Sequence, residues 1–185
     1  MGDLNFDKIN ARLARIPREF EGEVAQVGFP RGITYEDGTP VAYIAAIQNF
    51  GAPAAGIPKR PFIEPTVASK KEGWVRLMGD GARKVGEGNL SAFDVLDGVG
   101  RMAVADIQET IGTLTEPELS PITVLLRKWM KEGRTITGAT VGEAAAAIKA
   151  GVDPGSDNKP LNATGFLIAS VHNAVNKTDA AFEAS

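Results

Sequence analysis

The segment from Tyr43 to Pro65 restricts the fold more than any other part of the chain. Its sequence, YIAAIQNFGAPAAGIPKRPFIEP, begins with a short apolar run and then carries prolines at positions 53, 58, 61 and 65. Proline fixes φ, lacks a backbone N–H and favours an extended conformation at the residue before it. Residues 52–65 are therefore predicted to form a stiff loop. Gly51 is predicted to close a short helix before it by taking a positive φ.

Two phenylalanines, Phe50 and Phe62, flank this loop. Large aromatic side chains on such a segment either fill the core of their own domain or dock on a neighbouring chain. We expect both to lie in the core, because buried aromatic residues are mostly core residues. The outer surface of the loop is then expected to contact the next subunit or another partner, and its candidate contact residues are Ala52, Pro53, Ile57 and Arg60.

Apolar periodicity predicts helices along most of the chain. In the first half we expect a helix over residues 4–16 that Pro17 ends, and another that begins at Pro65 or Thr66 and frays at the glycines between positions 79 and 88. Ser91 precedes a longer pattern, in which Leu96, Gly100, Ala103, Ile107 and Ile111 form one buried face. Further helices are expected over 121–130 with Ser120 as N-cap, from Thr140 to Ala150, and over 161–175.

Strand signals are few, and they lie near the N-terminus. Residues 23–29 alternate in the manner of a half-buried strand, and Asp37-Gly38 between Tyr35 and Thr39 predicts a hairpin within residues 33–41. The expected fold class is α+β, with a small antiparallel sheet, several helices and a long proline-rich loop. At 185 residues we expect one domain, residues 1–185, with 112–160 a possible loop-rich insertion and 176–185 a frayed tail.

Charge and residue chemistry narrow the functional classes. The net charge of −3 is unlike that of a protein that binds DNA by neutralising phosphates. A basic cluster, formed by Arg127, Lys128 and Lys131, is either a solvated helix face or a contact with a partner.

The sequence suggests no catalytic, cofactor or metal residues. It contains no cysteine, and His172 is its single histidine, so no triad or histidine-based metal site follows from local spacing. Asp153, Asp157 and Asn158 lack the spacing of a calcium loop and are expected to form an ordinary turn. With no basic start, apolar leader or run of about 18 apolar residues, we expect neither export nor membrane insertion.

Two segments resemble a known family. TYEDGTPVAYIAAIQNFGA followed by IPKRPFIEPTV, and later KPLNATGFLIASV, resemble the neck and tail-completion proteins of tailed bacteriophages, in which a YxDGxxVAxxAAxNEFG run leads to an IPxRPF turn and a closing KPLxDTGxLxxS motif. SPITVLLRKW at 120–129 is similar more loosely. Gln48 and Asn49 stand where asparagine and glutamate are usual in that family.

The resemblance implies a structural virion protein of the head–tail junction that has no enzymatic activity and no cofactor. Its expected assembly is a cyclic ring of identical subunits, six-fold, between the capsid connector and the tail proteins, with DNA passing through without specific binding. The expected location is the virion, after assembly in the host cytoplasm. Two alternatives stay open: a tail terminator that caps the tail tube, and a small hydrolase with a dispersed site.

Overall fold

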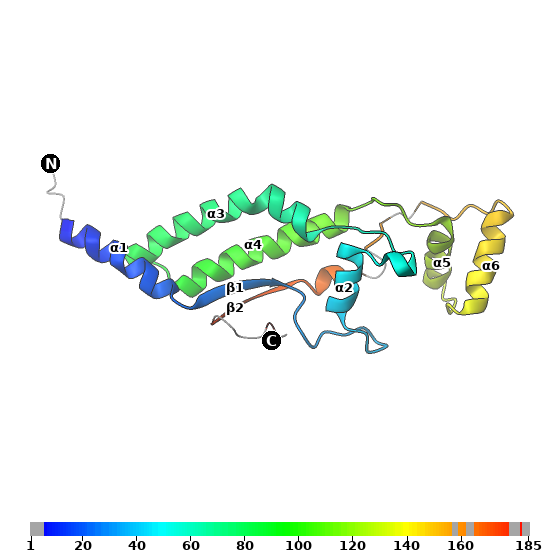
Figure 1. Ribbon diagram of the computed structural model, residues 1–185, viewed down its shortest axis with the longest axis horizontal. Coiled ribbons are helices and arrows are strands. Elements are labelled where there is room, and N and C mark those ends of the chain that lie inside the picture. The colour runs from blue at the N-terminus through cyan, green and yellow to red at the C-terminus, as the bar shows by residue number, and fades with distance from the viewer. Residues whose placement is uncertain (1–5, 157–158, 162–164, 178–181, 183–185) are drawn as a thin grey trace.

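The computed structural model describes residues 6–156, 159–161, 165–177 and 182. It confirms the α+β class, with helices arranged around one two-stranded antiparallel sheet (Figure 1). The elements in chain order are α1 (Phe6–Phe20), β1 (Glu23–Gly28), α2 (Val41–Phe50), a short 3-10 turn (Pro53–Ala55), α3 (Ile63–Glu87), α4 (Ala92–Thr113), α5 (Pro121–Lys131), α6 (Gly138–Lys149), α7 (Phe166–Ala169) and β2 (His172–Lys177).

The antiparallel pair α3 and α4 forms the body of the molecule (Figure 1). Gly88 ends α3 with φ of 83°, and Ser91 begins α4 with a capping box whose second member is Asp94. Every apolar residue predicted for the buried face of α4 is buried, which confirms that helix. The α3 prediction erred at both ends, because the helix begins at Ile63 and continues without a break through its glycines to Glu87.

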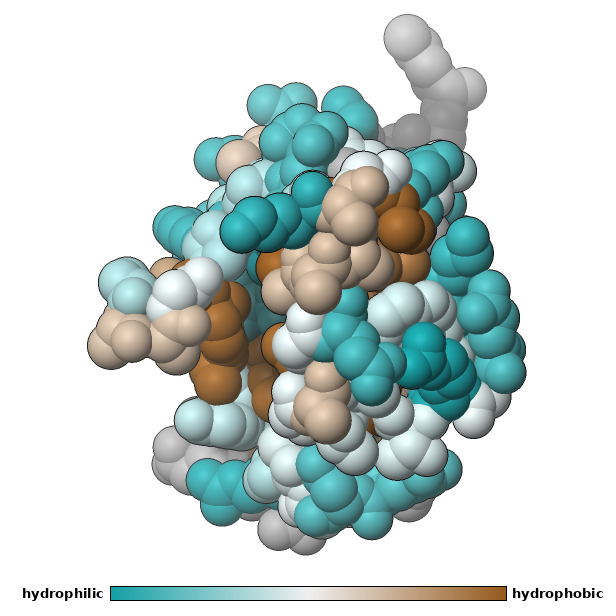
Figure 2. Space-filling model, turned by 90° about the vertical axis from the view of Figure 1, so that its right-hand side faces the viewer, coloured by the Kyte–Doolittle hydropathy of each residue, from teal (hydrophilic) through white to brown (hydrophobic). Residues whose placement is uncertain are grey.

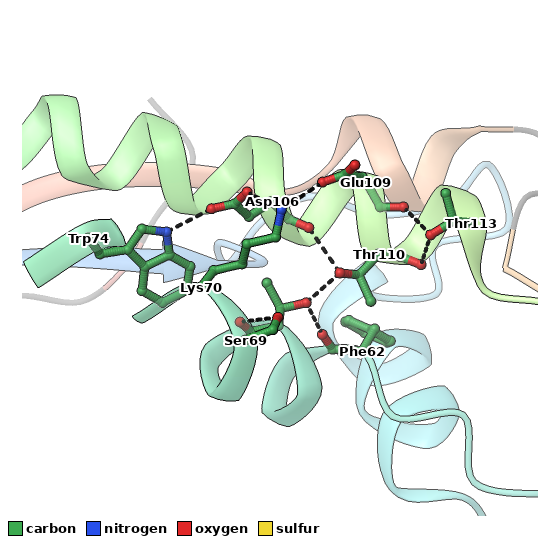
Figure 3. A network of polar contacts seen from close by, with 9 residues as sticks. Phe62, Ser69, Lys70, Trp74, Asp106, Glu109, Thr110 and Thr113 are labelled. Atoms are coloured by element: carbon green, nitrogen blue, oxygen red, sulfur yellow. Dashed lines mark hydrogen bonds and ion pairs between the residues drawn. The ribbon is translucent and has the colours of Figure 1, made fainter. Parts of the chain in front are cut away.

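A seam of polar contacts joins α3 to α4 (Figure 3). The hydroxyl of Thr66 lies 2.6 Å from both the carbonyl of Phe62 and the hydroxyl of Thr110. One turn further on, the indole of Trp74 donates to Asp106 at 2.7 Å, and Lys70 pairs with the same carboxylate at 3.2 Å. Because these partners lie at defined heights on the two helices, the seam sets how α3 and α4 align along their axes.

The sheet pairs the two ends of the chain. β1 and β2 run antiparallel from the pair Glu23 and Lys177 to the pair Gly28 and His172, and both strands lie along α4. The prediction of a helix over 161–175 is therefore wrong, since α7 is the helical part of the residues described there and β2 begins at His172. The physical reason is that Val171 and Val175 are four residues apart, a spacing that places them on one face of a helix and equally of a strand.

Two further predictions near the N-terminus are corrected. Pro17 lies inside α1 instead of ending it. Because Pro17 has no N–H, the backbone carbonyl of Leu13 loses its helical hydrogen bond. Leu13 is exposed, so water can reach that carbonyl. Residues 33–41 form only a turn with an isolated bridge between Thr34 and Pro40, because Pro40 has no N–H with which to extend a ladder.

The last predicted helices are closer to the structure. Ser120 caps α5 by accepting a hydrogen bond from the Thr123 N–H, as predicted. α6 begins at Gly138, two residues before its predicted start, with Thr137 as the N-cap and Thr140 as the third residue of the helix. The two helices pack on each other at the end of the molecule opposite α1 (Figure 1).

The main core lies where α2 and α7 meet the C-terminal half of α4. Phe62 is completely buried there, and the ring of Phe29 meets its ring edge-on with centroids 6.0 Å apart. The other buried members of this cluster are Val41, Ala45, Ile107, Ile111, Leu161, Leu167 and Val171.

We predict that Gly81→Ala destabilises the fold by about 1–3 kcal/mol, because the added methyl group overpacks the contact between α3 and α4. A Cβ at position 81 would lie 2.4 Å from Cγ1 of the buried Val95. Urea unfolding followed by circular dichroism measures the loss. Gly79→Ala is the matched control on the same helix: nothing lies within 4 Å of its Cβ, so it should gain about 0.5–1 kcal/mol through helix propensity. Equal effects of the two substitutions would refute the close approach.

Candidate functional site

Residues 50–62, here called the arch, run from the last residue of α2 to the residue before α3. Gly51 donates its N–H to the carbonyl of Ile47 at 2.8 Å and has φ of 78°, so it closes α2 as predicted. A Cβ at this position would lie 2.9 Å from the backbone nitrogen of Lys59. Ala52 and Ile57 form a bridge across the base of the turn. Glycine is therefore required at position 51 for both its backbone conformation and its closeness to the returning chain.

The side chain of Asn49 anchors the far end of the arch. It is 2% exposed, and its Oδ1 accepts hydrogen bonds from the N–H groups of Phe62 at 3.0 Å and Ile63 at 3.1 Å. Its Nδ2 donates to Glu64 at 3.1 Å. The pKa of Glu64 is lowered, first by a hydrogen bond from its own backbone N–H and then by the bond from Asn49. Asn49 thus satisfies N–H groups at the start of α3 that have no acceptor within the helix.

The two phenylalanines of the arch have opposite environments. Phe62 is fully buried, as predicted, but Phe50 is 65% exposed, so its assignment to the core is wrong. Phe50 is the last residue of α2, next to the buried Asn49, and neighbouring residues on a helix point in directions about 100° apart. Since Asn49 faces the interior, Phe50 faces solvent.

Arg60, the candidate contact residue at the far end of the arch, is largely buried. It is only 6% exposed, and its guanidinium binds its own chain: Nε donates to the Pro117 carbonyl at 3.1 Å and Nη2 to the Glu118 carbonyl at 3.4 Å. Nη1 donates to Oε1 of Gln48 at 3.3 Å. Burial lowers the pKa of Arg60. The guanidinium therefore joins α2, the arch and the connection that leads to α5.

The remaining candidate contact residues fall into two groups. Pro53 is exposed, whereas Ala52 and Ile57 are half-buried at the base of the arch. In the basic cluster, Lys128 and Lys131 are exposed. Arg127 is half-buried and donates to the carbonyls of Lys159 at 2.7 Å and Pro160 at 2.6 Å. The structure thus divides this cluster, because Arg127 ties α5 to the loop before α7 while the two lysines face solvent.

A cavity of about 500 Å³ opens between the arch and the first turn of α5. Its wall contains the two half-buried or buried arginines, Arg60 and Arg127, together with Gln48 and the side chains at the start of α5. Figure 2 views the end of the molecule that carries α5 and α6, where hydrophobic residues lie in a hollow beside a projecting segment. The full lining is Gln48, Gly56, Ile57, Pro58, Arg60, Glu118, Leu119, Ser120, Thr123, Arg127 and Pro160.

The described residues whose catalytic or metal-binding chemistry was considered in the sequence lie apart from this cavity. His172 is exposed on β2, and no group of three or more histidine, aspartate or glutamate residues suited to a metal ion occurs within the described ranges. Asp153 accepts a hydrogen bond from the Gly155 N–H at 2.9 Å, in agreement with a turn, while Asp157 and Asn158 lie outside the described residues. Among all the residues that the structure describes, no helix has the length and apolar character needed to cross a bilayer.

Sequence reasoning found the arch but missed two residues that hold it. In the sequence, Gln48 and Asn49 stand out only as departures from the family motif, but both contact the arch through their side chains. A signal was present for Asn49, because a polar residue stands in the apolar helix 41–50 at a position where the buried face continues.

We predict that Asn49→Ala lowers the unfolding free energy by about 2–4 kcal/mol, because it leaves the N–H groups of Phe62 and Ile63 without their acceptor. Thermal and urea unfolding measure the loss. Asn49→Asp keeps the acceptor but faces the Glu64 carboxylate, so the double variant Asn49→Asp, Glu64→Gln should be more stable than Asn49→Asp alone. The role of Asn49 would be refuted if the alanine variant unfolded like the wild type.

Comparisons with known proteins do not identify a relative. No family model matches the chain, and neither a curated protein nor a solved structure does. The resemblance to phage neck and tail-completion proteins therefore rests on the sequence motifs quoted above alone.

Proposed function

We propose that this chain is a structural subunit of the head–tail junction of a tailed phage, and that it works by assembling into a ring between the capsid connector and the tail. The observation that carries the proposal is the division of the arch motif into two sets of residues. Asn49, Gly51 and Phe62 hold the turn rigid from inside. Phe50 and Pro53 stand on its outer surface. Such a turn is suited to present apolar groups to a neighbouring chain at a defined angle.

A second support comes from α1. None of its residues is buried, and the exposed side chains of Phe6 and Leu13 lie on one stripe of the helix with Ile9. Figure 1 shows α1 projecting at one end of the body and α5 and α6 at the other. Exposed apolar groups at two separate places on one subunit fit heterologous contacts, in which one surface of a subunit meets a different surface of the next and closes a ring.

Two other functions, a tail terminator and a hydrolase, differ in how well they fit the arch and α1. The tail-terminator alternative also requires a ring, so the arch and α1 support it equally; imaging of the assembled particle distinguishes the two. The hydrolase alternative has no specific observation in its favour, because His172 is exposed on β2, away from the cavity beside the arch. Passage of DNA without tight binding is part of the proposal, and the net charge of −3 agrees with it.

The two phenylalanines of the arch give the sharpest test. Phe62→Ala should destabilise the subunit by about 3–5 kcal/mol, because it removes a fully buried ring. Phe50→Ala should leave the melting temperature within about a degree of the wild type, since exposed substitutions change stability little. Phe50→Ala should nevertheless weaken co-sedimentation of the chain with connector or tail complexes. Wild-type co-sedimentation of the Phe50 variant would contradict the proposed role of the arch surface.

The apolar stripe of α1 is tested separately. We expect the double variant Phe6→Ser, Leu13→Ser to keep the wild-type melting temperature and to form fewer rings, scored by electron microscopy of mixtures with connector or tail complexes. Ala14→Ser changes another exposed position on the same helix and serves as the control. A wild-type ring count from the double variant would exclude α1 from the subunit contact.

A further inference from the structure

The buried guanidinium of Arg60 carries a positive charge that no acidic side chain in the described part of the chain neutralises. Its hydrogen-bond acceptors are two backbone carbonyls and the amide oxygen of Gln48, all of them neutral. Glu118 lines the same cavity, but the bond from Arg60 goes to its carbonyl and no ion pair joins the two side chains. A charge that is withdrawn from water without a counter-ion is costly, and such charges in proteins are ordinarily paired.

The Arg60 guanidinium also has N–H groups that make no hydrogen bond within the described residues. Arginine has five N–H groups, and the three bonds to protein acceptors leave two of them without an acceptor among the described residues. The side chain lines the cavity of about 500 Å³. Ser120 and Thr123, at the N-terminus of α5, form part of the same wall, and the partial positive charge of a helix N-terminus also favours an anion.

We propose that this cavity is a binding site for a carboxylate, supplied by an acidic side chain of a partner protein, which pairs with Arg60. A carboxylate has the size and the paired oxygen atoms that match a guanidinium, and an ion pair of this kind is stronger than the bonds to uncharged oxygens that Arg60 now makes. The apolar residues beside it, Ile57, Pro58 and Leu119, would contact the stem and neighbours of the acidic residue.

A protein segment fits this cavity better than a nucleic acid backbone. Glu118 lies on the wall, so a polyanion that extended beyond one charged group would meet a negative charge. The chain is acidic as a whole, with a net charge of −3, which also disfavours a nucleic acid. Naming the partner as a neighbour in a head–tail junction rests on the proposed function, but the carboxylate site itself is a property of the single subunit and is testable without assembly.

The experiment titrates the purified full chain with the peptide acetyl-Ala-Glu-Ala-amide and follows the Nε–H resonance of Arg60 by ¹⁵N NMR. The expected result is a saturable shift of that resonance with the glutamate peptide and none with acetyl-Ala-Gln-Ala-amide. A short DNA duplex is the third ligand. The proposal is overturned if the glutamate peptide causes no shift, if both peptides act alike, or if the duplex shifts the resonance at lower concentration than the peptide.

Gln48→Glu supplies the matched variant, because it places a carboxylate at the position whose amide oxygen now accepts from Arg60 at 3.3 Å. With its own counter-ion, the site should bind the glutamate peptide at least about tenfold more weakly than the wild type does, since one charge-assisted bond is worth roughly that factor. Equal affinity of variant and wild type would overturn the proposal.

The same variant has a readout that does not depend on any ligand. We expect Gln48→Glu to melt at a higher temperature than the wild type at pH 7, because the buried guanidinium gains a counter-ion. Pairing lowers the folded-state pKa of the new carboxyl below its unfolded value of about 4.3, so the gain is present above that pH and is lost as the pH falls through the lower folded value. A lower melting temperature at pH 7 would mean that Arg60 needs no counter-ion, and would overturn the proposal.

Discussion

The junction of α2 and α3 depends on one amide side chain. Asn49 accepts the N–H groups of Phe62 and Ile63, and through them it decides where α3 starts and how the arch returns to the body. The backbone of Phe62 is held by this bond, and its ring packs in the core beside Phe29. The Asn49 side chain also binds Ile63, the first residue of α3, and so connects the hairpin of α3 and α4 to α2. A small polar group thus orients the largest helices of the chain.

Arg60 connects the arch to the part of the chain that carries α5 and α6. By binding the carbonyls of Pro117 and Glu118, it joins the arch to the connection that leads to α5. The helices α5 and α6 pack mainly on each other. The guanidinium of Arg60 binds the connection before α5, and that of Arg127 binds the loop before α7, so both tie this part of the chain to its surroundings. The position of α5 and α6 therefore depends on two cations whose bonds go to backbone oxygens.

The sequence predicted those elements in which a single physical rule decides the outcome. The buried face of α4 repeats at helical spacing over five turns, which no strand can satisfy, and the cap at Ser120 and the closing glycine at position 51 follow from local chemistry. β2 was missed because the spacing of Val171 and Val175 suits both periods, and its partner strand lies at the opposite end of the chain. The candidate site was predicted only in outline. Local pattern located the arch, but the burial of Arg60 and the exposure of Phe50 depend on contacts with distant residues.

The pairing of β1 with β2 has a consequence for how the chain is made. The side chains of Gln26 and Asn176, 150 residues apart in sequence, meet across the sheet, whereas α3 and α4 are joined by a short turn. Contacts between close residues form early and contacts across long loops form late, because closing a long loop costs entropy before it gains any bonds. During synthesis from the N-terminus, β1 emerges before β2, and its backbone groups stay unpaired until the residues up to β2 have been translated. The interval in which this strand is open to pairing with another molecule is therefore set by the time needed to synthesise everything between the two strands.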